Sequence, residues 1–318
     1  MPRARGGETG AAGGEMPRKD MPAPVGGGES EQDGASPVPG GIVDFHVHLF
    51  PDRLFEAIWD RFVTDYGWPI LHRFYWREAV DHLRRRGVGP IVFSNYAHRP
   101  GVARGLNDWN RSVLDEDPDL YCFAPFHPGD DDALAVAADV LRHPRVLGFK
   151  LQLLVQRLHP HDERLFPLYE LVMERGKHLL LHVGNGPVGN EFVGLDGFAK
   201  VLRRYPDLPA TVAHMGALEY GGFASLLEDH PGLLMDTAFA FIPRLGSMCD
   251  IGRKRLEGLR ERILYGSDFP NLLFPREDEI EHLRSLKLTD SFYRRAFREN
   301  GLALIRRACP DAPPKAEC

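Results

Sequence analysis

The sequence of 318 residues predicts an α/β fold, a (β/α)8 barrel with an aromatic-rich insertion after its first strand. Eight short apolar segments recur along the chain, and amphipathic segments with apolar residues at three- and four-residue steps separate them. Continuous apolar strands that alternate with helices are typical of a buried parallel sheet. Eight such units in roughly 265 residues fit the length of one closed barrel.

The predicted strands are Ile42–His48, Gly89–Phe93, Leu120–Pro125, Val146–Leu151, His178–Val183, Ala210–Met215, Leu233–Asp236 and Ile263–Gly266. Helices are predicted at Arg77–Arg86, Leu106–Asp115, Ala133–Arg142, Leu165–Arg175, Leu195–Arg204, Phe223–Asp229, Glu277–Leu286 and Asp290–Ala308. An open doubly wound sheet is the alternative arrangement. It is weakened because no Gly-x-Gly-x-x-Gly motif follows the first strand.

The two ends of the chain differ from this pattern. Residues 1–40 hold 10 Gly and 6 Pro and few aliphatic side chains, so we expect a disordered tail. They lack the run of 7 to 15 apolar residues that a secretory signal needs. Length alone allows two domains, but we expect a single barrel domain over residues 41–308 and a frayed end over 309–318.

The connection after the first strand is long and rich in aromatic residues, from Phe50 and Phe55 to Tyr75 and Trp76. An insertion of this size at the C-terminal end of a barrel is usually a lid or a pocket wall. A small helical hairpin that buries its aromatic rings against the barrel rim is the alternative, and both can hold.

Composition narrows the class of partner. The net charge is −6, with 39 Lys plus Arg against 45 Asp plus Glu, so the chain has no electrostatic signature of binding nucleic acid or anionic membranes. No segment approaches the ~18 apolar residues of a membrane span. The four cysteines form no Cys-x-x-Cys pair, which favours a reducing compartment. We therefore expect a cytoplasmic protein with a small-molecule substrate, monomeric or a homo-oligomer.

Polar side chains cluster where the predicted strands end. Asp44, His46 and His48 alternate along the first strand and so project to one face. The ends of four other strands carry Lys150, His182, His214 and Asp268. A barrel places its active site at this rim. These groups would be very costly to bury unpaired, and a divalent metal ion would satisfy them together.

Together these motifs resemble the amidohydrolase superfamily: Asp-x-His-x-His on the first strand, Gly-x-Lys on the fourth, single His residues ending the fifth and sixth, and Gly-Ser-Asp-x-Pro after the eighth. More narrowly, they resemble the amidohydrolase-related family that includes aminocarboxymuconate-semialdehyde decarboxylase-like enzymes. The late run Asn300–Leu304 is similar to that family's C-terminal helix start. The resemblance covers about residues 42–306 and implies a TIM barrel with one or two divalent ions, commonly zinc.

The resemblance also implies roles for these residues. His46, His48 and His182 would bind the metal, and Asp268 would bind it and move protons. His214 would be catalytic or a ligand of a second ion. Lys150 would bind metal only if carbamylated; otherwise it would hold a substrate carboxylate or pair with Asp268. We expect Asp44 to fix the tautomer of a ligand histidine.

The implied activity is metal-dependent hydrolysis of an amide, lactone or ester in a small substrate, carboxylate-bearing ones included. A non-oxidative decarboxylase (carboxy-lyase) is the alternative, because the same ligands serve both chemistries. Lys150 favours the hydrolase, since the decarboxylases of this family do not depend on a lysine there. A barrel that binds metal without turnover is the third hypothesis.

Further polar residues follow the predicted strands and are weaker candidates for substrate contact, with His127 and Arg244 suited to an anionic substrate. The others are Asn95, His98, Gln152, Gln156, Asn185 and Glu219. The remaining histidines are expected to be structural or on the surface.

Overall fold

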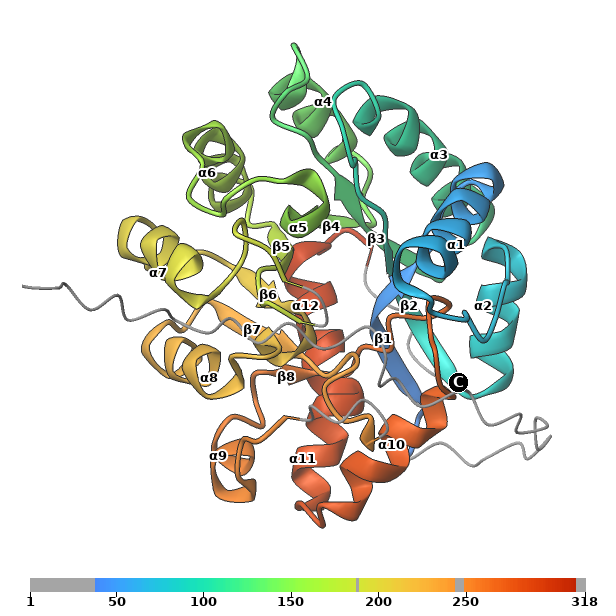
Figure 1. Ribbon diagram of the computed structural model, residues 1–318, viewed down its shortest axis with the longest axis vertical. Helices are drawn as coiled ribbons and strands as arrows, with labels where there is room; N and C mark the ends of the chain where they lie inside the picture. The colour runs from blue at the N-terminus through green and yellow to red at the C-terminus, as the bar shows by residue number, and fades with distance from the viewer. Residues whose placement is uncertain (1–37, 187–188, 244–248, 313–318) are drawn as a thin grey trace, which may run out of the picture.

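Eight parallel strands form one sheet that winds into a barrel, and helices surround it (Figure 1). The computed structural model describes residues 38–186, 189–243 and 249–312. Each strand is hydrogen-bonded to the next in chain order. The predicted (β/α)8 TIM barrel is therefore confirmed, and the doubly wound alternative is excluded because it requires a different strand order.

The strands coincide with the predicted apolar segments: β1 (Ile42–His48), β2 (Val88–Ser94), β3 (Leu120–Pro125), β4 (Val146–Gln152), β5 (His178–His182), β6 (Ala210–Val212), β7 (Leu233–Asp236) and β8 (Ile263–Leu264). β6 ends before its predicted end because the chain turns into the short 3-10 helix η2 (Ala213–Gly216). Within η2, His214 and Met215 have positive φ angles of 58° and 53°.

The outer helices are α1 (Asp52–Tyr66), α2 (Trp76–Arg85), α3 (Ala103–Glu116), α4 (Ala133–Val140), α5 (Leu153–Gln156), α6 (Phe166–Glu174), α7 (Leu195–Arg204), α8 (Tyr220–Asp229), α9 (Arg253–Gly258) and α10 (Arg276–Ser285). The 3-10 turn η1 (Glu163–Leu165) precedes α6. The predicted last helix is divided into α11 (Asp290–Arg294), the π-helical segment η4 (Arg295–Glu299) and α12 (Asn300–Ala308).

The barrel closes where the segment after β8 pairs with β1. The Phe45 backbone N–H donates to the Tyr265 carbonyl at 2.9 Å, and the Asp268 N–H donates to the His46 carbonyl at 2.7 Å. Val47 also pairs with Phe269 in a parallel bridge. These contacts bring the two ends of the sheet together, so residues from β1 and from beyond β8 can share one site.

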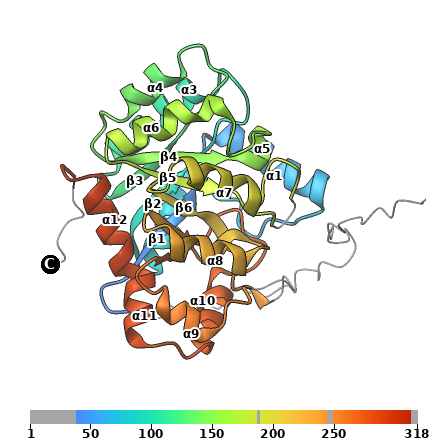
Figure 2. The ribbon, with the colours of Figure 1, turned by 90° about the vertical axis from the view of Figure 1, so that its left-hand side faces the viewer.

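α12 covers the end of the barrel at which the strands begin. Its Leu304, Ile305 and Ala308 pack in one buried cluster with residues such as Val43 of β1 and Leu147 of β4. Figure 2 shows α12 at one end of the barrel and α1 at the other. The strand C-termini therefore open toward α1, at the end where the polar residues were predicted to meet.

β1 contains a bulge. Between the pairs Asp44–Ile91 and Val47–Phe93 it has one residue more than β2, and the register shifts there. Phe45 consequently joins the interior cluster with α12. The strict alternation assumed from the sequence does not hold along this strand, which changes the position of Asp44.

The insertion after β1 combines both predicted arrangements. One face of α1 buries Phe55 and Trp59 against Phe50 in an aromatic cluster. Its other side, including Arg61 and Phe62, lines a cavity above the strand ends. The insertion is thus both a packed helix and a cavity wall.

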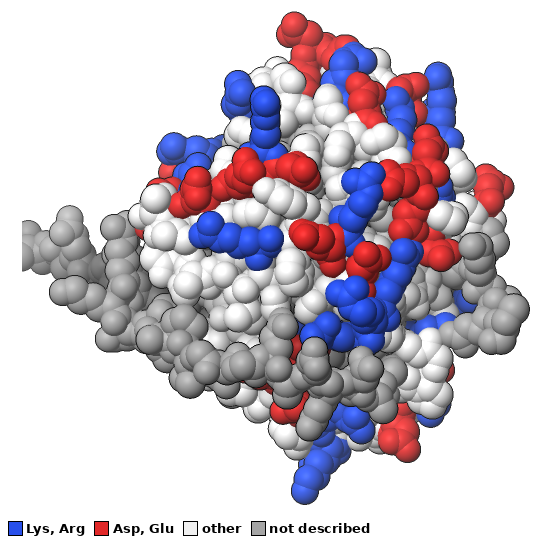
Figure 3. Space-filling model, turned by 90° about the vertical axis from the view of Figure 1, so that its right-hand side faces the viewer, with Lys and Arg blue, Asp and Glu red and all other residues white. Residues whose placement is uncertain are grey.

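Charged side chains of both signs intermix on the face that includes α2 and α3 (Figure 3). Arg77 of α2 binds both carboxylate oxygens of Glu116 in α3, for example. Among the helices described, none has the length and apolar character needed to cross a membrane.

At the chain ends, most of the predicted tail lies outside the described residues. Near the other end, Cys309 is buried and the Tyr121 hydroxyl donates to the Ala312 carbonyl at 2.7 Å.

Candidate metal centre

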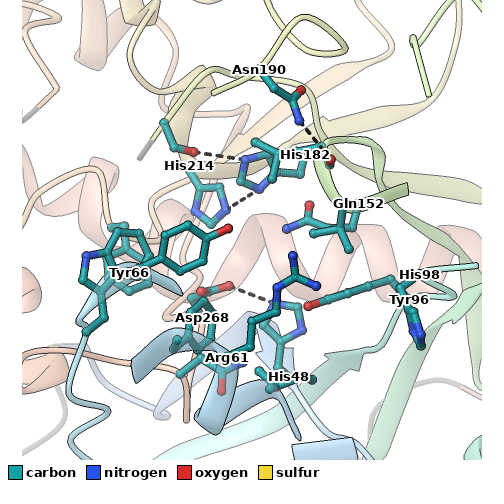
Figure 4. Close-up of a pocket in the computed structure, with 18 of the residues that line it drawn as sticks. His48, Arg61, Tyr66, Tyr96, His98, Gln152, His182, Asn190, His214 and Asp268 are labelled. Carbon is teal, nitrogen blue, oxygen red and sulfur yellow. Dashed lines mark hydrogen bonds and ion pairs between the residues drawn. The ribbon is translucent and has the colours of Figure 1, made fainter. Parts of the chain in front are cut away.

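A cavity of about 590 Å³ opens at the C-terminal ends of the strands. Its base is formed by His48, His182, His214 and Asp268, which Figure 4 shows turned toward one another. His46 is fully buried beneath them. The structure therefore brings together the five residues proposed from the sequence as the core of the site.

Asp268 lies at the meeting point of two histidines. Its Oδ1 atom is 3.1 Å from His46 Nε2 and 3.0 Å from His48 Nε2. These three donor atoms lie within 4.8 Å of one another, a spacing that would allow them to hold one metal ion.

Acceptors behind two of the imidazoles define which nitrogen carries the proton. His46 Nδ1 is 2.9 Å from an oxygen of Asp236, and His48 Nδ1 is 3.3 Å from the Ser94 carbonyl. Since a carbonyl or carboxylate oxygen accepts, each Nδ1 donates, and each Nε2 presents a lone pair to Asp268.

His182, which ends β5, and His214, which lies in η2 just after β6, repeat this arrangement. His214 Nδ1 faces the Ala238 carbonyl at 3.0 Å, and His182 Nε2 faces the Gly186 carbonyl at 3.1 Å. Their other nitrogens, His214 Nε2 and His182 Nδ1, then present lone pairs to each other across 3.2 Å. His182 would thus bind metal through Nδ1, whereas His46 and His48 would use Nε2.

The lone pairs of these imidazole nitrogens and of the Asp268 carboxylate face one another with no hydrogen between them. Such lone pairs repel, so the arrangement requires a cation among them. Asp268 Oδ1 is buried and has no hydrogen-bond partner among the described residues. Burial also lowers the pKa of His46 and His182 well below the usual range, so both rings are neutral. Neutral imidazoles with an orphaned carboxylate oxygen are the donor set of a divalent metal site, and the residues present fit such an ion.

Asp268 is ionised at neutral pH. Burial alone would raise its pKa, but positive charge on the side of His48 and His46 lowers it well below the usual range. A metal ion held between these rings would supply that charge. Its side chain is 16% exposed and lines the cavity, so it faces both the centre and the substrate space. Asp268 and His214 both have left-handed backbones, with φ of 62° and 58°, a strained conformation typical of functional sites.

Asp236 is a site residue that sequence reasoning missed. It ends β7, is fully buried, and its Oδ1 accepts from the backbone N–H groups of His214 and Ala238 at 2.9 and 3.2 Å. One carboxylate therefore orients His46 and positions His214. The signal was available, because Asp236 ends a predicted strand, and His182 was identified from its position near the end of another.

The tautomer role predicted for Asp44 belongs to Asp236 instead. Asp44 Oδ1 accepts from the backbone N–H groups of His46 and Ser267 at 3.3 and 3.1 Å, and among the described residues it forms no hydrogen bond with an imidazole nitrogen. The bulge in β1 is the physical reason, because it breaks the alternation that would have placed Asp44 beside the rings. Asp44 instead ties β1 to the turn that carries Asp268.

Lys150 lies beneath the cavity beside the metal centre. Its Nζ is 3.0 Å from His46 Nε2, and burial lowers its pKa to about 8. Lys150 does not line the cavity, so the geometry gives no support to a grip on a substrate carboxylate.

Of the weaker candidates for substrate contact, some line the cavity and others form hydrogen bonds that hold loops in place. His98 and Gln152 line the cavity, whereas His127 does not. Arg244 lies outside the described residues. The others hold loops in place: Asn95 bonds Leu49 and Asn110, Gln156 bonds Ala97 and Phe126, and Asn185 bonds Glu219.

The cavity wall contains further residues that the sequence did not single out. Arg61 and Tyr66 come from α1, Tyr96 follows β2, and Asn271 follows Asp268. Most of the remaining wall is apolar, with Phe50, Phe62, Trp68, Leu154, Val155, Phe192, Phe239 and Leu273. Such side chains become recognisable only once the fold places them together.

Comparison with known families identifies the barrel. The family profile described as amidohydrolase matches residues 43–307. The chain belongs to the amidohydrolase family. A comparison with curated protein sequences gave no match.

Three solved structures illustrate what this amidohydrolase resembles. A TIM-barrel protein, Bb4693, from Bordetella bronchiseptica is 17% identical with a TM-score of 0.66, covering 84% of this chain and 99% of its own. A candidate 2-pyrone-4,6-dicarboxylic acid hydrolase from Pseudomonas putida is 21% identical with a TM-score of 0.56, covering 84% and 98%. A 5-carboxyvanillate decarboxylase from Novosphingobium aromaticivorans, complexed with manganese, is 14% identical with a TM-score of 0.59, covering 92% and 100%. At these identities the likeness is one of fold.

Replacing both His46 and His48 by Ala is expected to abolish stoichiometric binding of divalent metal, because two of the three converging donors disappear. Elemental analysis after equilibration with zinc or manganese and desalting would measure this. His159→Ala, a histidine outside the centre, is the control and should bind as the native amidohydrolase does. Stoichiometric metal in the double variant would refute the assignment.

Asp236→Ala is expected to weaken metal affinity by about 10- to 100-fold, because His46 loses the acceptor that sets its tautomer and orientation. Competition with a chromogenic chelator would measure the affinity, with circular dichroism as a check on folding. Asp229→Ala at the exposed end of α8 is the control. A folded Asp236→Ala protein with metal affinity within about threefold of native would contradict the positioning role.

Proposed function

We propose that this amidohydrolase hydrolyses an amide, lactone or ester bond in a small substrate with the help of a divalent metal ion. The position of Asp268 is the observation that carries the proposal. An ionised carboxylate contacts His46 and His48 and also faces the cavity, so it can accept a proton from water beside a bound substrate.

Zinc is the ion we propose, because imidazole and carboxylate donors suit it in catalytic sites. The manganese in the related decarboxylase shows that this type of fold also holds another divalent ion. When bound, the ion would lower the pKa of water and polarise a substrate carbonyl. His46, His48, His182 and Asp268 are the proposed ligands.

His214 would position the attacking water. Its Nδ1 is held by the Ala238 carbonyl and its backbone N–H by Asp236, so its Nε2 has a fixed direction toward the centre. An imidazole nitrogen in this orientation can accept a hydrogen bond from water and take part of the positive charge that develops. Asp268 would then pass the proton it accepted to the leaving group.

The cavity walls favour a small substrate with a planar or apolar body. The wall is built from aromatic and aliphatic side chains, and Arg61 and His98 are basic groups within it. Arg61 binds Asp65 through Nε at 2.9 Å, and its terminal nitrogens have no partner among the described residues. A carboxylate-bearing substrate would satisfy them.

Decarboxylation is the second candidate, and one observation favours it specifically. His214 Nε2 lies within the centre rather than behind it, where its protonated form could deliver a proton to a substrate carbon. The related 5-carboxyvanillate decarboxylase has this overall fold, though at 14% identity it supports the fold alone.

A product assay separates the two chemistries. Metal-loaded protein would be incubated in ¹⁸O-labelled water with aryl esters, lactones, anilides and aromatic carboxylates. We expect labelled oxygen in a product carboxylate and no carbon dioxide. Asp268→Asn should remain folded and lose turnover by at least about a hundredfold. Carbon dioxide without label would support the decarboxylase, and stoichiometric metal with no reaction would support a barrel that only binds metal.

The state of Lys150 should be coupled to the number of ions. The two carboxylates, Asp236 and Asp268, are taken as ionised in both cases. One divalent ion beside the ammonium of an unmodified Lys150 then gives the site the same net charge as two divalent ions beside a negatively charged carbamate on Lys150. We expect an unmodified Lys150 with one ion, or a carbamate with two. Native mass spectrometry and elemental analysis on the same sample would test this. Two ions per chain with unmodified Lys150 would contradict the coupling.

A further inference from the structure

A phenol hydroxyl faces the cavity directly beside the metal centre. Tyr96 lies just beyond β2, and its ring packs edge-on against His48 at 5.9 Å and Phe50 at 5.4 Å between ring centroids. In Figure 4 its hydroxyl points into the middle of the cavity, on the side of His48 and Arg61.

The backbone on both sides of Tyr96 is anchored to the barrel. The preceding Asn95 is fully buried and donates to the Leu49 carbonyl at 3.1 Å and to Asn110 at 2.6 Å. The following Ala97 accepts from Gln156 Nε2 at 3.1 Å. The hydroxyl therefore has a fixed position before any substrate binds, which is the property that makes a hydrogen-bond donor effective in catalysis.

The hydroxyl is a donor that lacks a protein acceptor. No hydrogen bond joins it to another residue in the described part of the chain. A phenol keeps its proton at neutral pH, so the hydroxyl is available as a donor.

We propose that Tyr96 is a further catalytic residue, whose hydroxyl donates a hydrogen bond to the substrate carbonyl oxygen as that oxygen becomes an oxyanion. This inference rests on the proposed hydrolase function. Tyr96 is placed for the task because it adjoins His48 at the centre, while its oxygen projects into the space that a substrate would occupy.

The step balances without any further reactant. The oxygen of water forms a bond to the carbonyl carbon, the π electrons move to the carbonyl oxygen, and Asp268 accepts the water proton. Tyr96 stabilises the resulting oxyanion and keeps its own proton throughout. The carbonyl then re-forms, the bond to the leaving group breaks, and the leaving group takes the electron pair together with the proton from Asp268.

Tyr96→Phe in the full-length, metal-loaded protein tests the proposal, with p-nitrophenyl acetate as the kinetic probe. We expect kcat to fall by about 100-fold, in line with the loss of one oxyanion donor. KM should change less than about twofold and metal stoichiometry should not change. Tyr75→Phe is the matched control, because its hydroxyl bonds Glu56 on the exposed side of α1.

A binding measurement makes the test independent of turnover. Phenylphosphonate presents charged oxygens on a ring, whereas benzyl alcohol presents a neutral ring of similar size. By calorimetry, Tyr96→Phe should lower phenylphosphonate affinity about tenfold and leave benzyl alcohol affinity within about twofold. Equal losses for both probes would mean that Tyr96 merely shapes the cavity, and would overturn the proposal.

Two further outcomes are decisive. Phenylphosphonate affinity that is unchanged in Tyr96→Phe would overturn the proposal. So would a kcat within about threefold of native for Tyr96→Phe together with a loss of activity in Tyr66→Phe, since that would make Tyr66 of α1, and not Tyr96, the tyrosine that turnover needs. Absence of ester hydrolysis by the native protein counts against the hydrolase function itself. The phosphonate comparison would then still decide whether Tyr96 donates to an oxyanion.

Discussion

The hydrogen bond between His46 and Asp236 is the interaction on which the candidate centre depends. It spans the barrel from β1 to β7, and both side chains are fully buried. Because the carboxylate accepts from Nδ1, the lone pair on Nε2 points to Asp268. The same carboxylate holds the His214 backbone, so a single acid sets the direction of two imidazoles.

Close packing around this pair explains why it is so constrained. A Cβ atom on Gly266 would come within 2.7 Å of the His46 Cβ and 3.3 Å of the Asp236 Cβ. No side chain fits there without displacing one of them. Gly266 therefore allows the segment after β8 to lie close to both β1 and β7. Because the same close packing closes the barrel and holds His46 beside Asp236, the barrel cannot close in this way without also forming the centre.

The sequence sufficed for the barrel because its signals are local. Apolar runs predict strands, and a polar residue at the end of a run predicts a position on the rim, which located His182 and Asp268. Asp44 was misplaced because a bulge depends on pairing with β2, which no single strand encodes. Tyr96 was missed because its proposed role follows from the direction of one hydroxyl, and sequence spacing carries no such information.

The strand ends carry the residues proposed for the chemistry, whereas α1 supplies much of the cavity wall that would select the substrate. The proposed ligands, Asp268 among them, stand at strand ends that the sheet and buried hydrogen bonds fix in place. Much of the wall that a substrate would touch comes from α1, where Arg61 and Phe62 project from a helix whose opposite face is packed. Loops and insertions change more readily than a closed sheet, since fewer contacts depend on them. A change on the α1 surface would therefore alter the wall that a substrate touches without disturbing the barrel, whereas a change at His46 or Asp236 would disturb the barrel as well as the centre.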